Sequence, residues 1–70
     1  MTLGSLIEIF LDKEYDDKIY LTILDKNKGE VIIEFQRVFS QIFNPFKDSY
    51  IYSITELSEI YHYLVVIYKR

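Results

Sequence analysis

This chain must hold its fold together by hydrophobic packing alone, because its 70 residues include no cysteine and a single histidine, His62. The missing cysteines exclude disulfides, thiolate metal sites and thiol catalysis. A zinc site would need three carboxylates around His62, and the spacing of the acidic residues does not suggest one. A chain this short buries only about 60% of its unfolded surface. Stability must therefore come from a dense core or from self-association.

Half of the residues are hydrophobic and 17% are aromatic. That is more apolar surface than a short chain easily hides, and monomers seldom expose large contiguous apolar patches. An apolar content this high also excludes a long disordered chain. It predicts an adhesive face, either the interface of a homodimer or larger homo-oligomer or a surface that binds another protein.

The sequence shows no sign of export or of a membrane span. Its start lacks a basic region followed by an apolar stretch and a small-residue cleavage site. The longest uninterrupted apolar run, residues 63–68, is far shorter than the roughly 20 residues that cross a bilayer. We therefore expect a cytoplasmic protein without a membrane partner.

The clearest local pattern is an antiparallel hairpin. Residues 18–24 and 30–35 are rich in β-branched and aromatic side chains, and each segment alternates as a strand does. The alternation predicts two apolar faces, Ile19, Leu21 and Ile23 on the first strand and Val31, Ile33 and Phe35 on the second. Between them, residues 25–29 tolerate a left-handed backbone. A lone hairpin is unstable in water, so other elements must cover it.

Residues 3–15 fit either a helix or a strand, and helical periodicity fits better. Ser5 and Glu8 have the spacing of a capping box. A strand would place Leu6 and Phe10 beside Glu8 on the outer face. The helical arc consists of Leu3, Leu6, Ile7, Phe10 and Leu11.

Residues 36–43 carry apolar side chains at helical spacing, and Asn44 and Pro45 end that pattern. A short helix is therefore expected there. Residues 49–54 alternate, which favours a third strand.

The C-terminal segment shows the longest helical pattern in the chain. Its apolar face would consist of Ile54, Leu57, Ile60, Tyr61, Leu64, Ile67 and Tyr68. Ser53 and Glu56 would form a capping box. Against a helix, the branched side chains of residues 65–67 prefer strands, and a strand there would make the fold mostly β. We favour the helix.

These elements predict an α+β fold in one small domain that spans residues 1–70. An antiparallel hairpin or three-stranded sheet would pack against an N-terminal helix and a longer C-terminal helix.

The chain lacks the residues that most reactions need. Phosphate-binding loops need several glycines, and only Gly4 and Gly29 are present, outside any such pattern. His62 is the only base available to a serine nucleophile, and an exposed or interface position is the simpler interpretation. The acidic run from Asp12 does not match a calcium loop, because its sixth position is Asp17 and not glycine. We expect no enzyme activity, metal or cofactor.

Acidic side chains are concentrated in the first half of the chain. Residues 1–35 hold eight acidic and four basic side chains (net −4), and residues 36–70 hold three and four (net +1). The acidic patch consists of Glu8, Asp12, Glu14, Asp16 and Asp17. It would repel a phosphate backbone, so direct nucleic-acid binding is not expected. Its carboxylates could instead imitate phosphates in the basic groove of a nucleic-acid-processing enzyme, or only keep an adhesive protein in solution.

Tyrosines suggest a second route to partner binding, since tyrosine combines a large contact area with a polar tip. Tyr50 and Tyr52 share one face of the expected third strand. Tyr63 lies nearly opposite the apolar arc of the expected last helix. We predict these three as interface anchors, with ordinary amphipathic edge residues as the alternative.

The sequence therefore predicts a small non-catalytic protein-binding module that occupies a partner protein through the acidic patch and the tyrosines. Inhibitors or regulators encoded by phages or plasmids have this size and character. One alternative is a structural homo-oligomer or assembly subunit whose apolar face is covered by its own copies. Another is a nucleic-acid-binding regulator.

Overall fold

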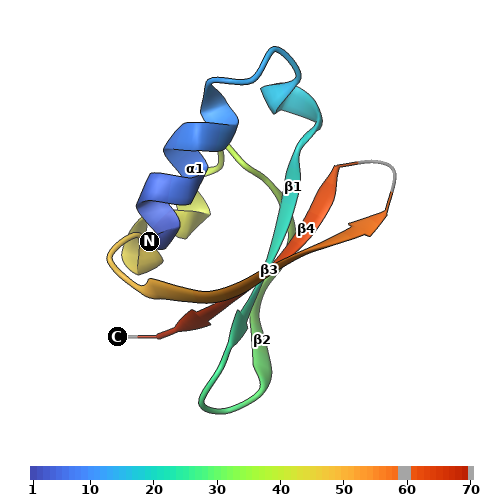
Figure 1. Cartoon of the computed structure of the whole chain (residues 1–70). Coiled ribbons are helices and arrows are strands. Elements are labelled where there is room, and N and C mark those ends of the chain that lie inside the picture. Colours follow the sequence, from blue (N-terminus) through green and yellow to red (C-terminus); the bar gives the residue numbers. More distant parts are fainter. Residues whose placement is uncertain (59–60, 70) are drawn as a thin grey trace.

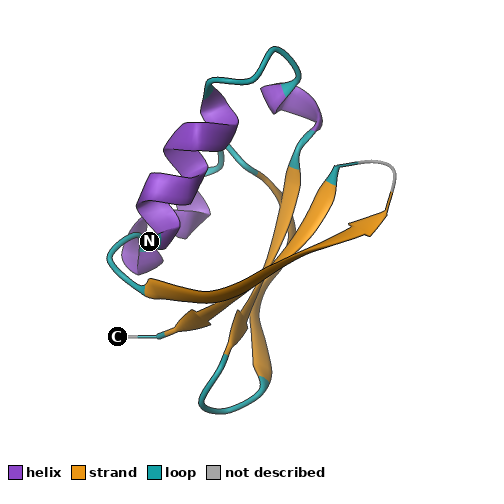
Figure 2. Ribbon diagram, viewed as in Figure 1, coloured by secondary structure: helices purple, strands orange, loops and turns teal. Residues whose placement is uncertain are grey.

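The computed structural model describes residues 1–58 and 61–69. Within them, four strands form one mixed sheet in the order β2-β1-β4-β3, and the helices lie together on one side of it (Figures 1 and 2). In chain order the elements are the helix α1 (Leu3–Leu11), the 3-10 helix η1 (Asp16–Lys18), the strands β1 (Tyr20–Asp25) and β2 (Glu30–Arg37), the 3-10 helix η2 (Gln41–Phe46), and the strands β3 (Tyr50–Ser58) and β4 (His62–Tyr68).

The two central strands come from distant parts of the chain. β1 and β4 pair in parallel, with Tyr20 opposite His62 and Asp25 opposite Ile67. β2 pairs with β1 and β3 pairs with β4, both antiparallel. β2 and β3 are therefore the edges of the sheet.

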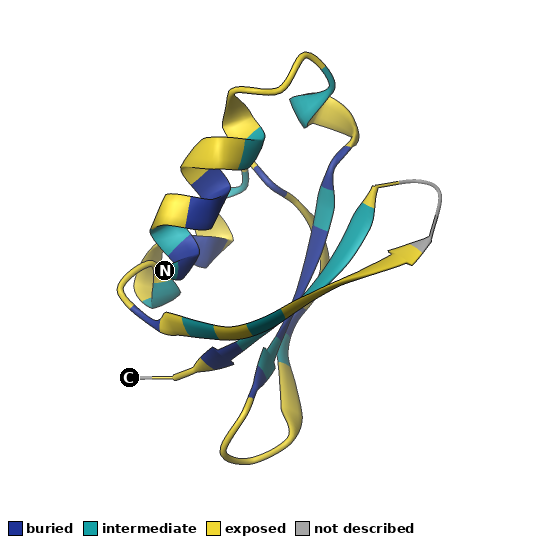
Figure 3. Ribbon diagram, in the orientation of Figure 1, coloured by how far each residue is buried: buried dark blue, intermediate teal, exposed yellow. Residues whose placement is uncertain are grey.

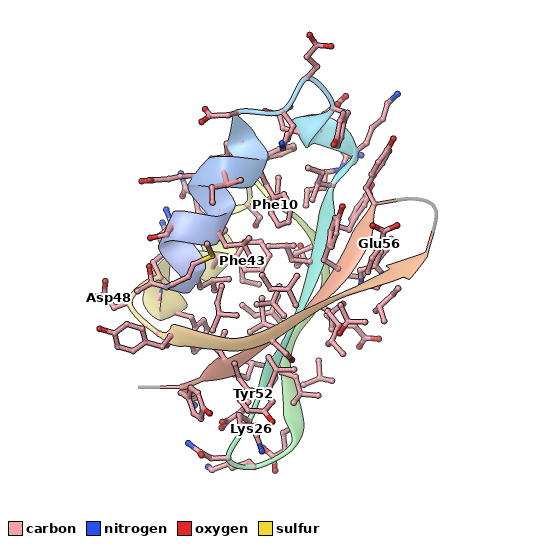
Figure 4. All side chains as sticks on the ribbon, in the orientation of Figure 1. Phe10, Lys26, Phe43, Asp48, Tyr52 and Glu56 are labelled. Atoms are coloured by element: carbon pink, nitrogen blue, oxygen red, sulfur yellow. The ribbon has the colours of Figure 1, made fainter. Side chains whose placement is uncertain are left out.

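The core lies between the helices and one face of the sheet (Figure 3). Phe43 of η2 is fully buried there, and Figure 4 shows Phe43 and Phe10 between α1 and the sheet. The buried hydrophobic residues are Leu3, Leu6, Ile7, Ile19, Leu21, Ile23, Ile33, Val38, Phe43, Val65 and Ile67. None of the helices in the described residues is long and apolar enough to cross a membrane.

The expected N-terminal helix is confirmed for Leu3–Leu11, and its expected cap is wrong. The Thr2 side chain accepts a hydrogen bond from the Ser5 N–H, so Thr2 is the N-cap and Ser5 lies inside α1. A threonine at this position satisfies a free N–H group of the first turn as a serine would. The helix therefore begins three residues earlier than a cap at Ser5 would allow.

The antiparallel hairpin is confirmed. The turn between β1 and β2 closes with the Gly29 N–H donating to the Asp25 carbonyl at 2.8 Å. Gly29 has φ +66°, a conformation that glycine adopts without steric penalty. The expected single face of β2 is wrong, however. Two register shifts interrupt its pairing with β1, and only Ile33 of the three predicted residues is buried, while Val31 and Phe35 are exposed.

The predicted C-terminal helix is wrong, and so is the architecture built on it. β3 runs through Ser53 and Glu56, the expected capping box, and β4 replaces the helix from His62 onward. Val65 and Ile67 are buried against the helix side, whereas Leu64 and Val66 point the other way and are half-buried. A central strand with apolar side chains on both faces matches a helical period as well as a strand period.

The short helix expected over residues 36–43 is also displaced. β2 continues to Arg37, and the helical segment is η2, Gln41–Phe46, with Pro45 inside it. Proline has no N–H group, so Pro45 removes one hydrogen bond from this short 3-10 helix.

Candidate protein interface

The face of the sheet that points away from α1 and η2 is not covered by any described element (Figure 2). Because Leu21 and Ile23 point into the core, their neighbours in β1 point to the opposite face. Residues paired directly across strands share a face, which extends the assignment to the other strands. The open sheet face, as defined by this register and by ring contacts, consists of Tyr20, Thr22, Leu24, Val31, Phe35, Arg37, Tyr50, Tyr52, Ser53, Thr55, His62, Leu64, Val66 and Tyr68.

At one end of the open sheet face, three rings pack together across three strands. The rings of Tyr20 and Phe35 are stacked, with centroids 4.3 Å apart and planes 3° from parallel. The His62 ring meets Phe35 edge-on, with centroids 4.8 Å apart. Arrangements of this kind contribute about 0.5–1.5 kcal/mol beyond their buried area.

A hydrogen-bond network beneath these rings fixes them to the sheet. The buried Thr22 side chain accepts from the Phe35 N–H at 3.1 Å. Its hydroxyl also lies 2.7 Å from His62 Nε2. One threonine therefore ties β2 to the histidine of β4, across β1.

The backbone of Phe35 has φ +49°, a region that bulky side chains rarely adopt. The residue lies where the pairing of β1 with β2 skips between Leu21 and Ile23, as in a bulge. The extra residue lets the ring lie over Tyr20 instead of entering the core. The exposed fraction of Phe35 is still 44%, so intramolecular packing leaves much of the side chain accessible to a partner.

A second aromatic pair lies nearer the other end of the face. The rings of Tyr52 and Tyr68 meet at 90°, with centroids 5.7 Å apart. Lys26 Nζ lies 4.8 Å from the centre of the Tyr52 ring, and both side chains are labelled in Figure 4. Between the two aromatic groups lie half-buried aliphatic side chains of the central strands, Leu24, Leu64 and Val66.

Charge on the open sheet face is one-sided. Arg37 lies over the rings of Tyr20, at 5.8 Å, and Phe39, at 6.0 Å. Its Nε also donates to the Tyr20 hydroxyl at 3.2 Å. None of the side chains that define the face is a carboxylate, while Glu34 lies within the irregular part of β2, outside the paired register. This composition resembles the centre of a protein interface, where aromatic residues and arginine are enriched and aspartate and glutamate depleted.

The structure separates the predicted tyrosines. Tyr50 and Tyr52 lie on the open sheet face and are well exposed. Tyr63 lies on the opposite face, where its ring packs against Phe10 with centroids 4.9 Å apart. Burial and the nearby Glu56 carboxylate raise the pKa of the Tyr63 phenol. Tyr63 is therefore a partly buried neighbour of the core, away from the other two.

The acidic patch also lies away from the open sheet face. Glu8 belongs to α1, Asp12 and Glu14 follow that helix, and Asp16 and Asp17 begin η1, so the patch lies on α1 and on the segment that joins it to β1 (Figure 1). The structure therefore does not bring the acidic patch together with Tyr50 and Tyr52. No group of three His, Cys, Asp or Glu side chains within the described residues is placed to hold a metal.

Sequence reasoning missed the residues that define most of this face, including Tyr20, Phe35, Arg37, His62 and Tyr68. One signal was present in β1, where Tyr20, Thr22 and Leu24 alternate with the core residues, so that both faces of the strand carry bulky side chains. Comparisons with protein-family models, with curated proteins and with solved structures found no match.

Proposed function

We propose that this chain is a non-catalytic protein-binding module whose working surface is the open sheet face. The observation that carries the proposal is a face with an aliphatic centre and aromatic side chains on both sides of it, left uncovered by the chain's own helices. Side chains at the centre of a desolvated interface provide most of the binding energy, and aromatic residues and arginine dominate among them.

Binding in this proposal is stoichiometric occupation of a partner surface, as in an inhibitor or regulator. Tyr50 and Tyr52 act together with Tyr20, Phe35 and Tyr68, so more aromatic side chains contact the partner than the sequence predicted. The acidic patch keeps the protein in solution and does not contact the partner. A basic partner docked on that patch is the competing mechanism, and the experiment below distinguishes the two.

The test is quantitative affinity capture from the source cell with four baits. The first is the native chain, and the second is Val31→Glu/Tyr52→Glu, which places two carboxylates on exposed positions of the open sheet face. The third is Ile9→Glu, a matched exposed apolar position on α1. The fourth neutralises the patch with Asp12→Asn/Asp17→Asn.

A partner that uses the open sheet face should be captured by the native chain, the Ile9 variant and the Asn variant, and lost with the Val31/Tyr52 variant. Loss of capture with the Asn variant alone would mean that the partner binds the acidic patch. Capture of no protein, an untagged copy of the chain included, would contradict a protein-binding function.

A further inference from the structure

We propose that the occupant of the open sheet face is a second copy of this chain, packed sheet against sheet in a symmetric dimer. This inference rests on the proposed function and names the partner of that same surface. Shape, charge and the state of the cations on the face each support it.

The shape of the face suits its own copy. β-sheets share one hand of twist, and two such sheets pack face to face about 10 Å apart with their strands inclined by about 30°. The contact is made by interdigitating apolar side chains of the two inner faces. Leu24, Leu64 and Val66 occupy those positions on the two central strands. A two-fold axis through this region would place each aliphatic centre against the other.

The distribution of charge selects this face over the helical layer for self-association. The chain carries a net charge of −3, and the acidic patch lies on α1 and on the segment that joins α1 to β1, outside the strands (Figure 1). Two copies that meet through their open sheet faces keep both acidic patches apart. They bring together only the cations of the two faces, Lys26 and Arg37, which already lie over rings of their own chain. A contact through the helical layers would bring like charges together, which disfavours association.

The cations on the face are already engaged, which argues against a nucleic acid as the occupant. Lys26 lies over Tyr52, and Arg37 donates to the Tyr20 hydroxyl while it lies over two rings. Binding of single strands needs a cationic groove that follows the backbone and ring faces on which successive bases stack. Here the aliphatic side chains of Leu24, Leu64 and Val66 occupy the middle of the face instead of rings.

The size of the face predicts a weak dimer. Four strands spaced about 4.8 Å apart, with about seven residues each, give a footprint of roughly 19 by 23 Å, or about 440 Å². Protruding side chains raise the buried accessible area above this value, yet a standard interface buries about 800 Å² per partner. We therefore expect a dissociation constant on the order of micromolar.

Sedimentation equilibrium of the native chain between about 1 and 500 µM tests the dimer. The mass should rise from one chain to two across this range, and Ile9→Glu should behave identically. Val31→Glu/Tyr52→Glu should raise the dissociation constant by at least about tenfold, because two carboxylates must lose their hydration in the interface and only position 52 has a cation, Lys26, beside it. Circular dichroism checks that both variants retain the native fold.

A second measurement needs no variant. In a mixture of isotope-labelled and unlabelled chains, filtered nuclear Overhauser effects between copies should join the methyl groups of Leu64 and Val66. Contacts between copies at α1 instead, or a mass of one chain at every concentration, would overturn the dimer.

The outcomes separate this inference from the proposed function. A monomer that still captures a different protein, with loss of capture in the Val31/Tyr52 variant, refutes the second copy and keeps the protein-binding face. A monomer whose native form, and not that variant, binds fluorescein-labelled oligothymidine refutes both and assigns the face to single-stranded nucleic acid.

Discussion

Replacing Phe35 by glycine and, separately, by alanine should reverse the order of stability that these two residues normally have in a strand. Phe35 lies in β2 with φ +49°. Both replacements remove the same ring and therefore lose the same contacts with Tyr20 and His62. The difference between the two variants then reports the backbone conformation alone.

The expected magnitude follows from two opposed terms. A left-handed backbone costs a residue with a Cβ about 1–2 kcal/mol, and glycine avoids this penalty. Glycine in turn loses about 0.5–1 kcal/mol relative to alanine through its greater freedom in the unfolded chain. The strain term is the larger, so Phe35→Gly should be more stable than Phe35→Ala by about 0.5–1 kcal/mol. Both should be less stable than the native chain because each lost ring pair contributes about 0.5–1.5 kcal/mol.

Urea denaturation followed by circular dichroism measures the difference. With a slope of about 1 kcal/mol/M for a chain of this size, the glycine variant should unfold at a urea concentration roughly 0.5–1 M higher than the alanine variant. Val31 provides the matched control, since it is exposed in the same strand and its φ is not positive. There alanine should be the more stable replacement. An alanine variant at position 35 as stable as the glycine variant would refute the strain argument.

Three further changes test other parts of the structure. Thr22→Val removes the acceptor of the Phe35 N–H and should lower the free energy of unfolding by about 1–3 kcal/mol, while Thr22→Ser retains most of it in the same urea assay. Burial raises the pKa of the Tyr63 phenol above 10.0, so the folded state favours the neutral phenol. The stabilisation that results is complete below about pH 10 and is lost as the pH rises through the pKa of the folded state. Tyr63→Phe should remove that alkaline loss from urea midpoints measured on both sides of pH 10. Phe43→Ala should lower the free energy of unfolding by about 3–5 kcal/mol, which is much of the roughly 4–10 kcal/mol expected for the whole chain. Ile42→Ala, at an exposed position of the same helix, should change the thermal melt little.

The elements that the sequence predicted correctly depend on neighbouring residues. The helix near Leu3 buries one apolar arc formed by Leu3, Leu6 and Ile7. The first hairpin has a turn that ends in Gly29. The C-terminal half depends on distant partners instead. β4 is a strand because it pairs in parallel with β1, and His62 lies opposite Tyr20 although 42 positions separate them in the sequence. A periodicity analysis does not detect such a pairing.

The candidate site was predicted only in part because register decides which face a side chain occupies. Strict alternation placed Phe35 on the same face as Ile33, in the core. A single extra residue in a strand reverses the faces of the residues that follow it. The same effect acts at Tyr52, where the pairing of β3 with β4 skips a residue between Ile51 and Ser53. Bulges of this kind leave little trace in a sequence when no glycine marks them.

Phe35 also bears on whether the open sheet face binds a partner. Its backbone is strained and its ring is 44% exposed, so a glycine or asparagine would relieve the strain at the loss of only a half-exposed ring. Strained residues of this kind concentrate at functional sites, where the surrounding structure holds them in place. A partner sheet would cover the exposed part of the ring and supply the contacts that the monomer lacks. The Phe35→Gly variant should then be more stable than Phe35→Ala, because glycine relieves the backbone strain that alanine retains. It should dimerise no better than Phe35→Ala, because both variants lack the ring.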